Sequence, residues 1–232
     1  MKTIRYIITR CAVLSFIILL MLPLLVVADR GLTANMKRGD KVVFGRYEQD
    51  DNLTNGPEAL EWLVLDCSEG NALLISRYVI DQKPFNRMNE KITWRDSSVR
   101  KWLNESFISE AFNEEEREKI RRIQLKNDES QSNPANPIDG GTETNDQVFL
   151  LSFYEARLYF ADNVARQTIP TQYAIKNGVV PKAKNGMSFW WLRSPSKNLF
   201  NAAVVSDSGE IGSGSYVDRM YNGIRPAIWV RL

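Results

Sequence analysis

The chain has 232 residues, of which 44% are hydrophobic and 25% are charged, the balance of a globular protein. This length supplies one domain of ordinary size or two small ones. The chain contains no histidine, which excludes Ser-His-Asp and Cys-His catalysis and every zinc site built on imidazole. Acid–base chemistry would therefore depend on carboxylates, lysine, tyrosine or cysteine.

Residues 1–28 have the features of a secretory signal peptide. The chain starts with basic residues, and an apolar run of 18 residues follows from Cys11 to Ala28, with Pro23 inside it. Val26 and Ala28 stand at the spacing that signal peptidase recognises. The run is at the lower edge for a membrane span, so an uncleaved N-terminal anchor is the alternative. We expect cleavage and export of the body to the cell surface or the extracellular space.

Removing this segment changes the charge balance. Residues 1–28 hold three of the 30 Lys and Arg residues and none of the 28 Asp and Glu residues, which leaves 27 against 28. A nearly neutral body predicts no basic face for nucleic acid. The body retains one cysteine, Cys67, and so has no internal disulfide, which a domain of this size does not need. We expect no cofactor, and membrane contact only if the N-terminal segment is uncleaved.

Residues 29–38 are polar and unpatterned, and we interpret them as a tether to a single domain over residues 39–232. The domain begins with a β pattern: KVVFGRY, and then two apolar runs joined by SEGN, which has the composition of a hairpin turn. Cys67 lies in the first of these runs, WLVLDCS, where a thiol usually behaves as a small hydrophobic group.

Helical patterns follow in the middle of the chain. TWRDSSVRKWLNESF has apolar residues on one helical face, and Asp96 or Ser97 can cap it. A second helix is expected at NEEERE, because Asn113 and Glu116 have capping-box spacing. Further along, QVFLLSFYEARLYF predicts a strand and then a helix that begins after Ser152, and TQYAIKNG predicts a short helix.

Residues 127–146 contain almost nothing apolar, and such a long polar stretch inside a domain is commonly functional or disordered. Asp139, Glu143 and Asp146 offer oxygen ligands of the kind that suit calcium. No ordered metal-binding spacing accompanies them, so a solvated loop is the alternative.

The C-terminal part returns to β patterns, with FWWLRS, a hairpin about SDSG, and GIRPAIWV. In a strand, neighbouring side chains point to opposite faces, so Trp191 shares a face with Arg193. Two alternatives are open: both tryptophans are core residues with Arg193 in a buried ion pair, or Trp191 and Arg193 form a platform for sugars, carboxylates or peptides. Arg225 is a third candidate ligand-binding residue, although buried charges are usually paired structurally. Pro226 marks a sheet edge or a strand start.

Seven segments in this order resemble an uncharacterised bacterial family, domain of unknown function 6273: GDKVVFGRYEQD, LEWLVLD, ALLISRYVIDQKPFN, TWRDSSVRKWLNESF, QVFLLSFYEA, FWWLRSP and GIRPAI. The resemblance covers about residues 39–232. It implies an exported protein of Gram-positive-type bacteria, often placed beside cell-surface modules, and it implies no activity.

More distantly, the closing segments are similar to the C-type-lectin-like superfamily, which includes the formylglycine-generating sulfatase modifiers. That similarity implies an α+β fold with a small twisted antiparallel sheet, two or three helices and long loops. The calcium motifs of the sugar-binding lectins are missing, and the body has one cysteine where the oxygenase branch needs two to hold copper. The order of elements also favours an α+β fold over a doubly wound parallel sheet.

We therefore expect a non-catalytic exported domain that recognises a sugar or protein ligand at the bacterial cell surface. Two alternatives remain: an enzyme related to the sulfatase-modifying oxygenases, and a purely structural envelope protein.

Overall fold

The computed structural model describes residues 31–131 and 135–232. The predicted signal peptide or anchor, residues 1–28, lies outside the described residues. Within them, no helix is both long and apolar enough to cross a membrane. At the end of the predicted tether, Met36 is buried and the Arg38 guanidinium donates to the backbone oxygen of Tyr159 over 2.8 Å, so the last residues of this segment pack against the domain.

The first sheet joins strands from both ends of the chain. Its order is β1-β2-β3-β12-β7, and every neighbouring pair is antiparallel. The strands are β1 (Lys41–Tyr47), β2 (Glu58–Ser68), β3 (Asn71–Ser76), β12 (Ala227–Arg231) and β7 (Val148–Phe149).

The turn between β2 and β3 confirms the hairpin expected at SEGN. Glu69 and Gly70 are its two central residues, with φ of 49° and 73°. Two successive positive φ values are the geometry of a type I′ turn, whose twist matches that of the flanking strands.

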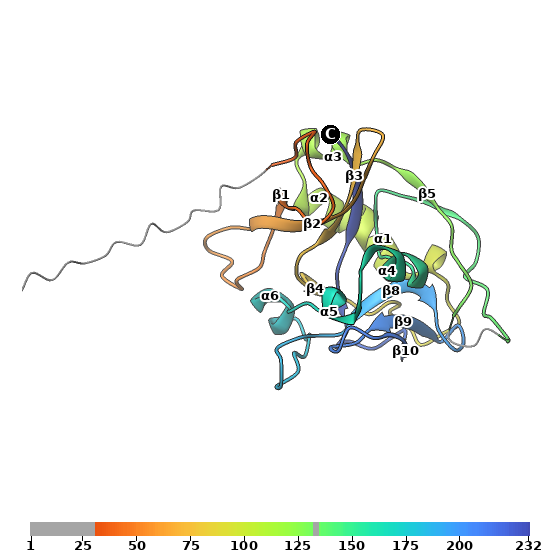
Figure 1. The fold of residues 1–232 in the computed structure, drawn as a ribbon. Coiled ribbons are helices and arrows are strands. Elements are labelled where there is room, and N and C mark those ends of the chain that lie inside the picture. Colours follow the sequence, from red (N-terminus) through yellow and green to blue (C-terminus); the bar gives the residue numbers. More distant parts are fainter. Residues whose placement is uncertain (1–30, 132–134) are drawn as a thin grey trace, which may run out of the picture.

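The second sheet has the order β10-β9-β8-β11-β4, in which β11 runs parallel to β8 and the other neighbours are antiparallel. Strands β1 to β3 lie in the upper part of Figure 1 and β8 to β10 in the lower part. The strands are β10 (Ile211–Tyr216), β9 (Asn201–Val205), β8 (Trp190–Pro195), β11 (Gly223–Ile224) and β4 (Asp81–Gln82).

The segment GIRPAIWV connects the two sheets. It supplies β11 to the second sheet and β12 to the first, and Arg225 and Pro226 lie between them. Pro226 has no backbone N–H to donate, but its carbonyl accepts from the backbone of Ser76 over 2.9 Å. The prediction that Pro226 marks a strand start is confirmed, because β12 begins at the next residue.

The helices are short and capped by side chains. Ser97 accepts from the backbone N–H of Arg100, as predicted, and capping boxes form between Asn113 and Glu116 and between Ser152 and Glu155. The helices are the 3₁₀ turn η1 (Trp94–Asp96), α1 (Ser98–Trp102), the π-helical η2 (Leu103–Phe107), α2 (Ile108–Ala111), α3 (Glu114–Lys119), α4 (Phe153–Tyr159), α5 (Asn163–Arg166) and α6 (Gln172–Lys176).

The α+β class is confirmed, with mostly antiparallel sheets and few long helices. The described residues form two five-stranded sheets and a small pair, β5 (Ile123–Leu125) with β6 (Thr144–Asp146), where one small sheet was expected. The helices are also more numerous and shorter than the expected two or three. One continuous cluster of buried side chains spans both sheets.

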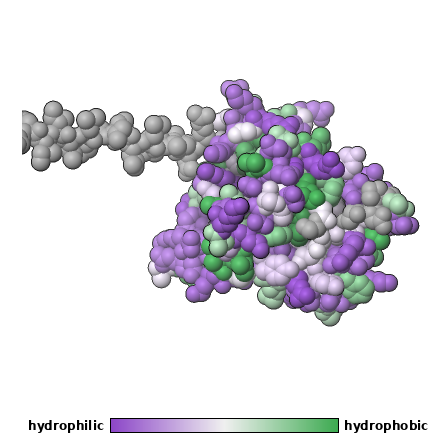
Figure 2. Space-filling model, turned by 60° about the horizontal axis from the view of Figure 1, so that its bottom comes forward, coloured by the Kyte–Doolittle hydropathy of each residue, from purple (hydrophilic) through white to green (hydrophobic). Residues whose placement is uncertain are grey.

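Figure 2 brings forward the face that lies at the bottom of Figure 1, near β9 and β10. Apolar side chains are scattered there among polar ones. A binding site on this face therefore has to be sought in a local hollow rather than in one broad apolar surface.

Candidate functional site

Trp191 lies in the core and forms no exposed platform. Its side chain is 0% exposed, its indole N–H donates to the backbone oxygen of Lys83 over 3.1 Å, and its ring centroid lies 5.8 Å from that of Phe85. Residues that follow β4 thus cover the second face of β8. The prediction of an exposed Trp191 is wrong, because strand alternation separates two faces but does not say whether both are covered.

Arg193 forms the buried ion pair that was the alternative to a platform. It is 3% exposed, and its guanidinium forms a two-pronged contact with the carboxylate of Glu155, with Nη2 to Oε1 at 2.9 Å. The same group donates to the backbone oxygens of Leu150 over 2.9 Å and Lys126 over 3.1 Å. The planar donor fork of arginine suits this arrangement, which an ammonium could not reproduce.

The ion pair belongs to a larger connection, the α4–β8 clamp, formed by Ser152, Glu155, Arg193 and Ser194. Glu155 accepts from the backbone N–H of Ser152 over 2.8 Å while it pairs with Arg193. The hydroxyl of Ser194 accepts from the backbone N–H of Phe153 over 2.9 Å. The clamp thus ties the first turn of α4 to β8, and it explains why LLSFYEA and WWLRSP carry these polar residues.

Arg225 is also a structural residue, but backbone oxygens and aromatic rings hold its guanidinium, and not the ion-pair partner expected for a buried charge. It is 2% exposed, and its guanidinium donates to the backbone oxygens of Ser76 over 2.9 Å and Arg166 over 3.2 Å. Its charge lies 5.0 Å from the ring centroid of Trp190 and 5.3 Å from that of Phe160. Burial lowers the pKa of Arg225 to about 9. Among the described residues no carboxylate forms a salt bridge with it.

The three calcium candidates do not converge. Asp146 lies in β6, is 0% exposed, and is occupied by the guanidinium of Arg100 at 2.7 Å and the indole N–H of Trp94 at 2.9 Å. Asp139 accepts from a backbone N–H in its own turn, and Glu143 accepts from the side chain of Gln124. Asp146 is therefore a buried structural ion and not part of an open loop.

Asp139 and Glu143 do line one hollow, of about 650 Å³, over the polar loop. Its lining also includes Asp128, Glu129 and Lys126, so several charged side chains surround it. The loop itself is shorter than expected, because β5 and β6 pair at its base through Ile123 to Asp146.

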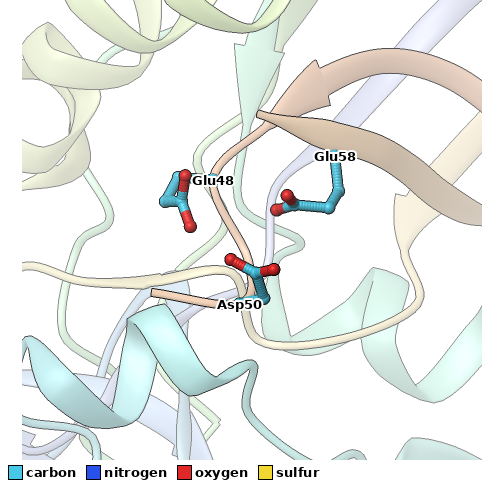
Figure 3. A group of neighbouring side chains, drawn as sticks. All are labelled: Glu48, Asp50 and Glu58. Carbon is cyan, nitrogen blue, oxygen red and sulfur yellow. The ribbon is translucent and has the colours of Figure 1, made fainter. Parts of the chain in front are cut away.

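Another acidic group was not predicted, and Figure 3 shows it. Carboxylate oxygens of Glu48, Asp50 and Glu58 lie within 4.8 Å of one another. The pKa of Glu48 is raised, first by desolvation and then by the negative charge of Glu58 and a hydrogen bond with Asp50. The pKa of Asp50 is lowered by hydrogen bonds from Asn55 and Asn52. The register that places Glu58 opposite Tyr47 joins residues ten or more positions apart, so this group was not predictable from a local pattern.

A second hollow, the Asn222 pocket, has a different character. Its volume is about 420 Å³, and apolar groups dominate its lining. It lies over β9 and β10 and beside the first residues of β8 and β11. The lining residues are Val180, Lys182, Phe189, Val204, Gly214, Ser215, Tyr221 and Asn222.

Asn222 is the unusual residue of this pocket. It is 0% exposed, yet neither its amide nitrogen nor its amide oxygen has a hydrogen-bond partner among the described residues. Buried polar side chains are nearly always paired, and each unpaired group costs about 1–3 kcal/mol. The next residue, Gly223, fixes the position of Asn222. The backbone N–H of Gly223 donates to the backbone oxygen of Phe189 over 2.9 Å, and Gly223 is the strand partner of Trp190.

Other polar side chains line the same pocket. The ammonium of Lys182 lies 5.3 Å from the ring centroid of Phe189, and the hydroxyl of Tyr221 lies 3.3 Å from that of Ser215. Sequence reasoning missed the site because Asn-Gly at 222–223 is also a common turn signal. The only local hint is an aromatic residue, Tyr221, beside an asparagine before a short apolar strand.

Comparison with known proteins identifies the family and no more. No curated protein matches the chain, and no solved structure matches it. The family described as Domain of unknown function (DUF6273) matches residues 69–232, which include α4, β8, β11 and the Asn222 pocket. The chain therefore belongs to the family of domain of unknown function 6273.

Proposed function

We propose that this protein is an exported, non-catalytic domain that recognises a sugar or protein ligand at the bacterial cell surface. The observation that carries the proposal is the Asn222 pocket, which combines a mostly apolar lining with a few polar side chains, those of Lys182, Ser215 and Tyr221. Ligand sites commonly have this composition, and volumes of about 300–1,000 Å³ are usual for them.

Export is supported by the sequence of residues 1–28, with its basic start, apolar run and small residues before the expected cleavage position. The near-neutral body gives no reason to expect nucleic acid as a partner. We expect membrane contact only if the N-terminal segment is retained.

A C-type-lectin-like arrangement is the finer fold that we propose. The order of a helix after LS-x-x-EA (α4), a tryptophan-rich strand (β8) and a last strand pair from G-I-R supports it. In this arrangement the motif residues Glu155, Arg193 and Arg225 hold the scaffold, and loops and strand ends supply the binding surface.

A non-catalytic role is favoured over the oxygenase alternative by the chemistry of Cys67. The pKa of its thiol is raised, first by partial burial and then by the negative charges of Asp66 and Asp40. A thiol that holds its proton is a poor nucleophile and a poor copper ligand. We propose no cofactor.

A binding screen with the secreted protein tests the proposal. The full chain would be produced in a Gram-positive host, and the mature protein applied to arrays of glycans, peptidoglycan fragments and surface proteins. We expect saturable binding to at least one class of ligand. A complete lack of binding would favour the structural envelope protein, and stoichiometric copper binding that is lost in Cys67→Ser would favour the enzyme.

A further inference from the structure

We infer that the Asn222 pocket binds an acidic sugar unit of a glycan, whose carboxylate pairs with the ammonium of Lys182. This inference rests on the proposed function and names the ligand class of that site. It starts from lining side chains that solvent reaches: Lys182 is exposed, and Val180 and Tyr221 are 60% and 46% exposed. A ligand in the pocket can therefore contact these side chains directly.

The floor of the pocket is the uncovered part of one sheet face. Val204 lies opposite Trp191, and alternation along the strand brings Phe189, two residues before Trp191, to the same face. The ring of Phe85 covers Trp191, whereas Phe189 is half-buried and lines the hollow. The pocket thus begins where the cover over β8 ends, and an aromatic ring forms part of its floor.

Backbone hydrogen bonds hold Lys182 beside this floor. Its backbone N–H donates to the oxygen of Met187 over 2.8 Å, and its carbonyl accepts from the N–H of Gly186 over 2.8 Å. Its ammonium lies 5.3 Å from the ring centroid of Phe189, so the charge is located at the pocket lining.

The charge of Lys182 is not neutralised within the pocket. Among the described residues no carboxylate forms a salt bridge with Lys182, and none lines the hollow. A carboxylate on the ligand supplies the missing partner, through hydrogen bonds that its charge strengthens. A cationic ligand would be repelled.

The remaining lining favours a sugar over an alkyl acid. Phe189 and Val180 offer apolar surface for the C–H face of a sugar ring. The hydroxyls of Ser215 and Tyr221 lie 3.3 Å apart, and a hydrogen bond between them uses only one of their two O–H donors. A sugar hydroxyl can accept from the other donor, whereas an alkyl chain would displace water and leave it without a partner.

Size and position favour a glycan over a protein partner. A volume of about 420 Å³ is suited to one or two sugar rings, whereas a stable protein interface usually covers about 800 Å² on each partner. An extended peptide would normally add to a free strand edge, but this pocket lies over a sheet face.

The test applies isothermal titration calorimetry to the mature full-length protein. The acidic probes are trimers of galacturonic acid and of mannuronic acid, which differ in stereochemistry. Their methyl esters keep the sugar rings and remove the charge, and acetyl-alanyl-alanine offers a carboxylate without a sugar. We expect at least one acidic trimer to bind about tenfold more tightly than its ester and than the peptide, and to weaken as sodium chloride is added.

The decisive variant is Lys182→Met, which keeps an unbranched apolar side chain and removes the charge. Because Lys182 is exposed, we expect an unchanged melting temperature, together with a fall in the affinity for the acidic trimer to about that of the ester. Lys184→Met is the matched control: Lys184 is an exposed lysine of the same loop that does not line the pocket. We expect its affinity to stay within about twofold of wild type.

Several outcomes would overturn the inference and leave the proposed function standing. They are equal binding of acidic trimers and esters, tighter binding of the peptide, an equal loss of affinity in the two lysine variants, and no binding of either acidic trimer while another ligand binds on the arrays. A loss of less than about threefold in Lys182→Met would also overturn it, because the ammonium would then make no contact with the carboxylate. If Lys182→Met lowers the melting temperature, the comparison of acid with ester on the wild-type protein decides. Absence of binding by these probes and by every ligand on the arrays would remove the proposed function as well.

Discussion

Removing the guanidinium of the α4–β8 clamp should destabilise the protein far more than removing an exposed arginine. Arg193→Met leaves Glu155 without its partner and takes the donors from two backbone oxygens, those of Leu150 and Lys126. An unpaired buried polar group costs about 1–3 kcal/mol, and breaking a buried ion pair by removing one partner costs about 3–5 kcal/mol. Glu155 keeps 24% of its side-chain exposure and can partly rehydrate. We therefore expect a loss of about 3–4 kcal/mol.

The chain supplies a matched control in the ion pair between Arg77 and Glu61. It has the same chemistry, but its side chains are 37% and 38% exposed. Exposed pairs contribute about 0–1 kcal/mol, so Arg77→Met should cost no more than that. The free energy of unfolding of both variants would be measured by urea denaturation, with the slopes compared to check two-state behaviour.

A double-mutant cycle with Glu155→Gln isolates the pair itself. We expect a coupling energy of about 1–3 kcal/mol between positions 155 and 193. If Arg193→Met costs no more than Arg77→Met, or if the coupling is absent, the clamp does not hold α4 to β8 and its role must be sought elsewhere.

Three further predictions concern other parts of the chain. Trp190→Ala and Trp191→Ala should each cost about 3–5 kcal/mol in urea denaturation, because both rings are fully buried; a cost below about 1 kcal/mol for Trp191→Ala would mean that its ring is exposed after all. The folded-state pKa of Glu48 is raised, so its contribution to stability is present below its unfolded pKa and is lost as the pH rises through the folded pKa. Glu48→Gln should therefore have a higher melting temperature than wild type at neutral pH, and the gap between the two should become smaller near pH 4. A gap that does not change with pH would contradict the raised pKa of Glu48. Mass spectrometry of the secreted protein should find an N-terminus that follows Ala28, whereas an intact chain extracted from membranes would establish an anchor.

The local parts of the fold were predictable because their causes are local. The SEGN turn needs two residues with positive φ, and the capping boxes need only a side chain and a backbone three residues away. Pro226 forces a strand boundary wherever it lies, because it has no N–H to donate. These features follow from short segments, and the structure contains all of them.

The roles of the polar residues were less predictable because they depend on partners far away in the sequence. Alternation in FWWLRS correctly separates Trp190 from Trp191, but the cover over Trp191 comes from Phe85, more than one hundred residues earlier. The polar sequence around Asp146 predicts a solvated loop. In the structure, however, Arg100 and Trp94 donate hydrogen bonds to its buried carboxylate. The unpaired amide of Asn222 is likewise a property of the packed protein, which a turn-like Asn-Gly pair does not indicate.

The central claim is that the motif residues of the second sheet hold the fold, while ligand recognition takes place at the Asn222 pocket. Two-dimensional NMR of the ¹⁵N-labelled mature protein, titrated with the ligand that binds best on the arrays, tests both halves of this claim in one measurement. The account predicts that the backbone amide signals of Gly214 and Tyr221, which line the pocket, shift with saturation, while the indole N–H signal of the buried Trp191 stays in place. A saturable shift of the Trp191 indole, with the Gly214 and Tyr221 amides unmoved, would contradict it.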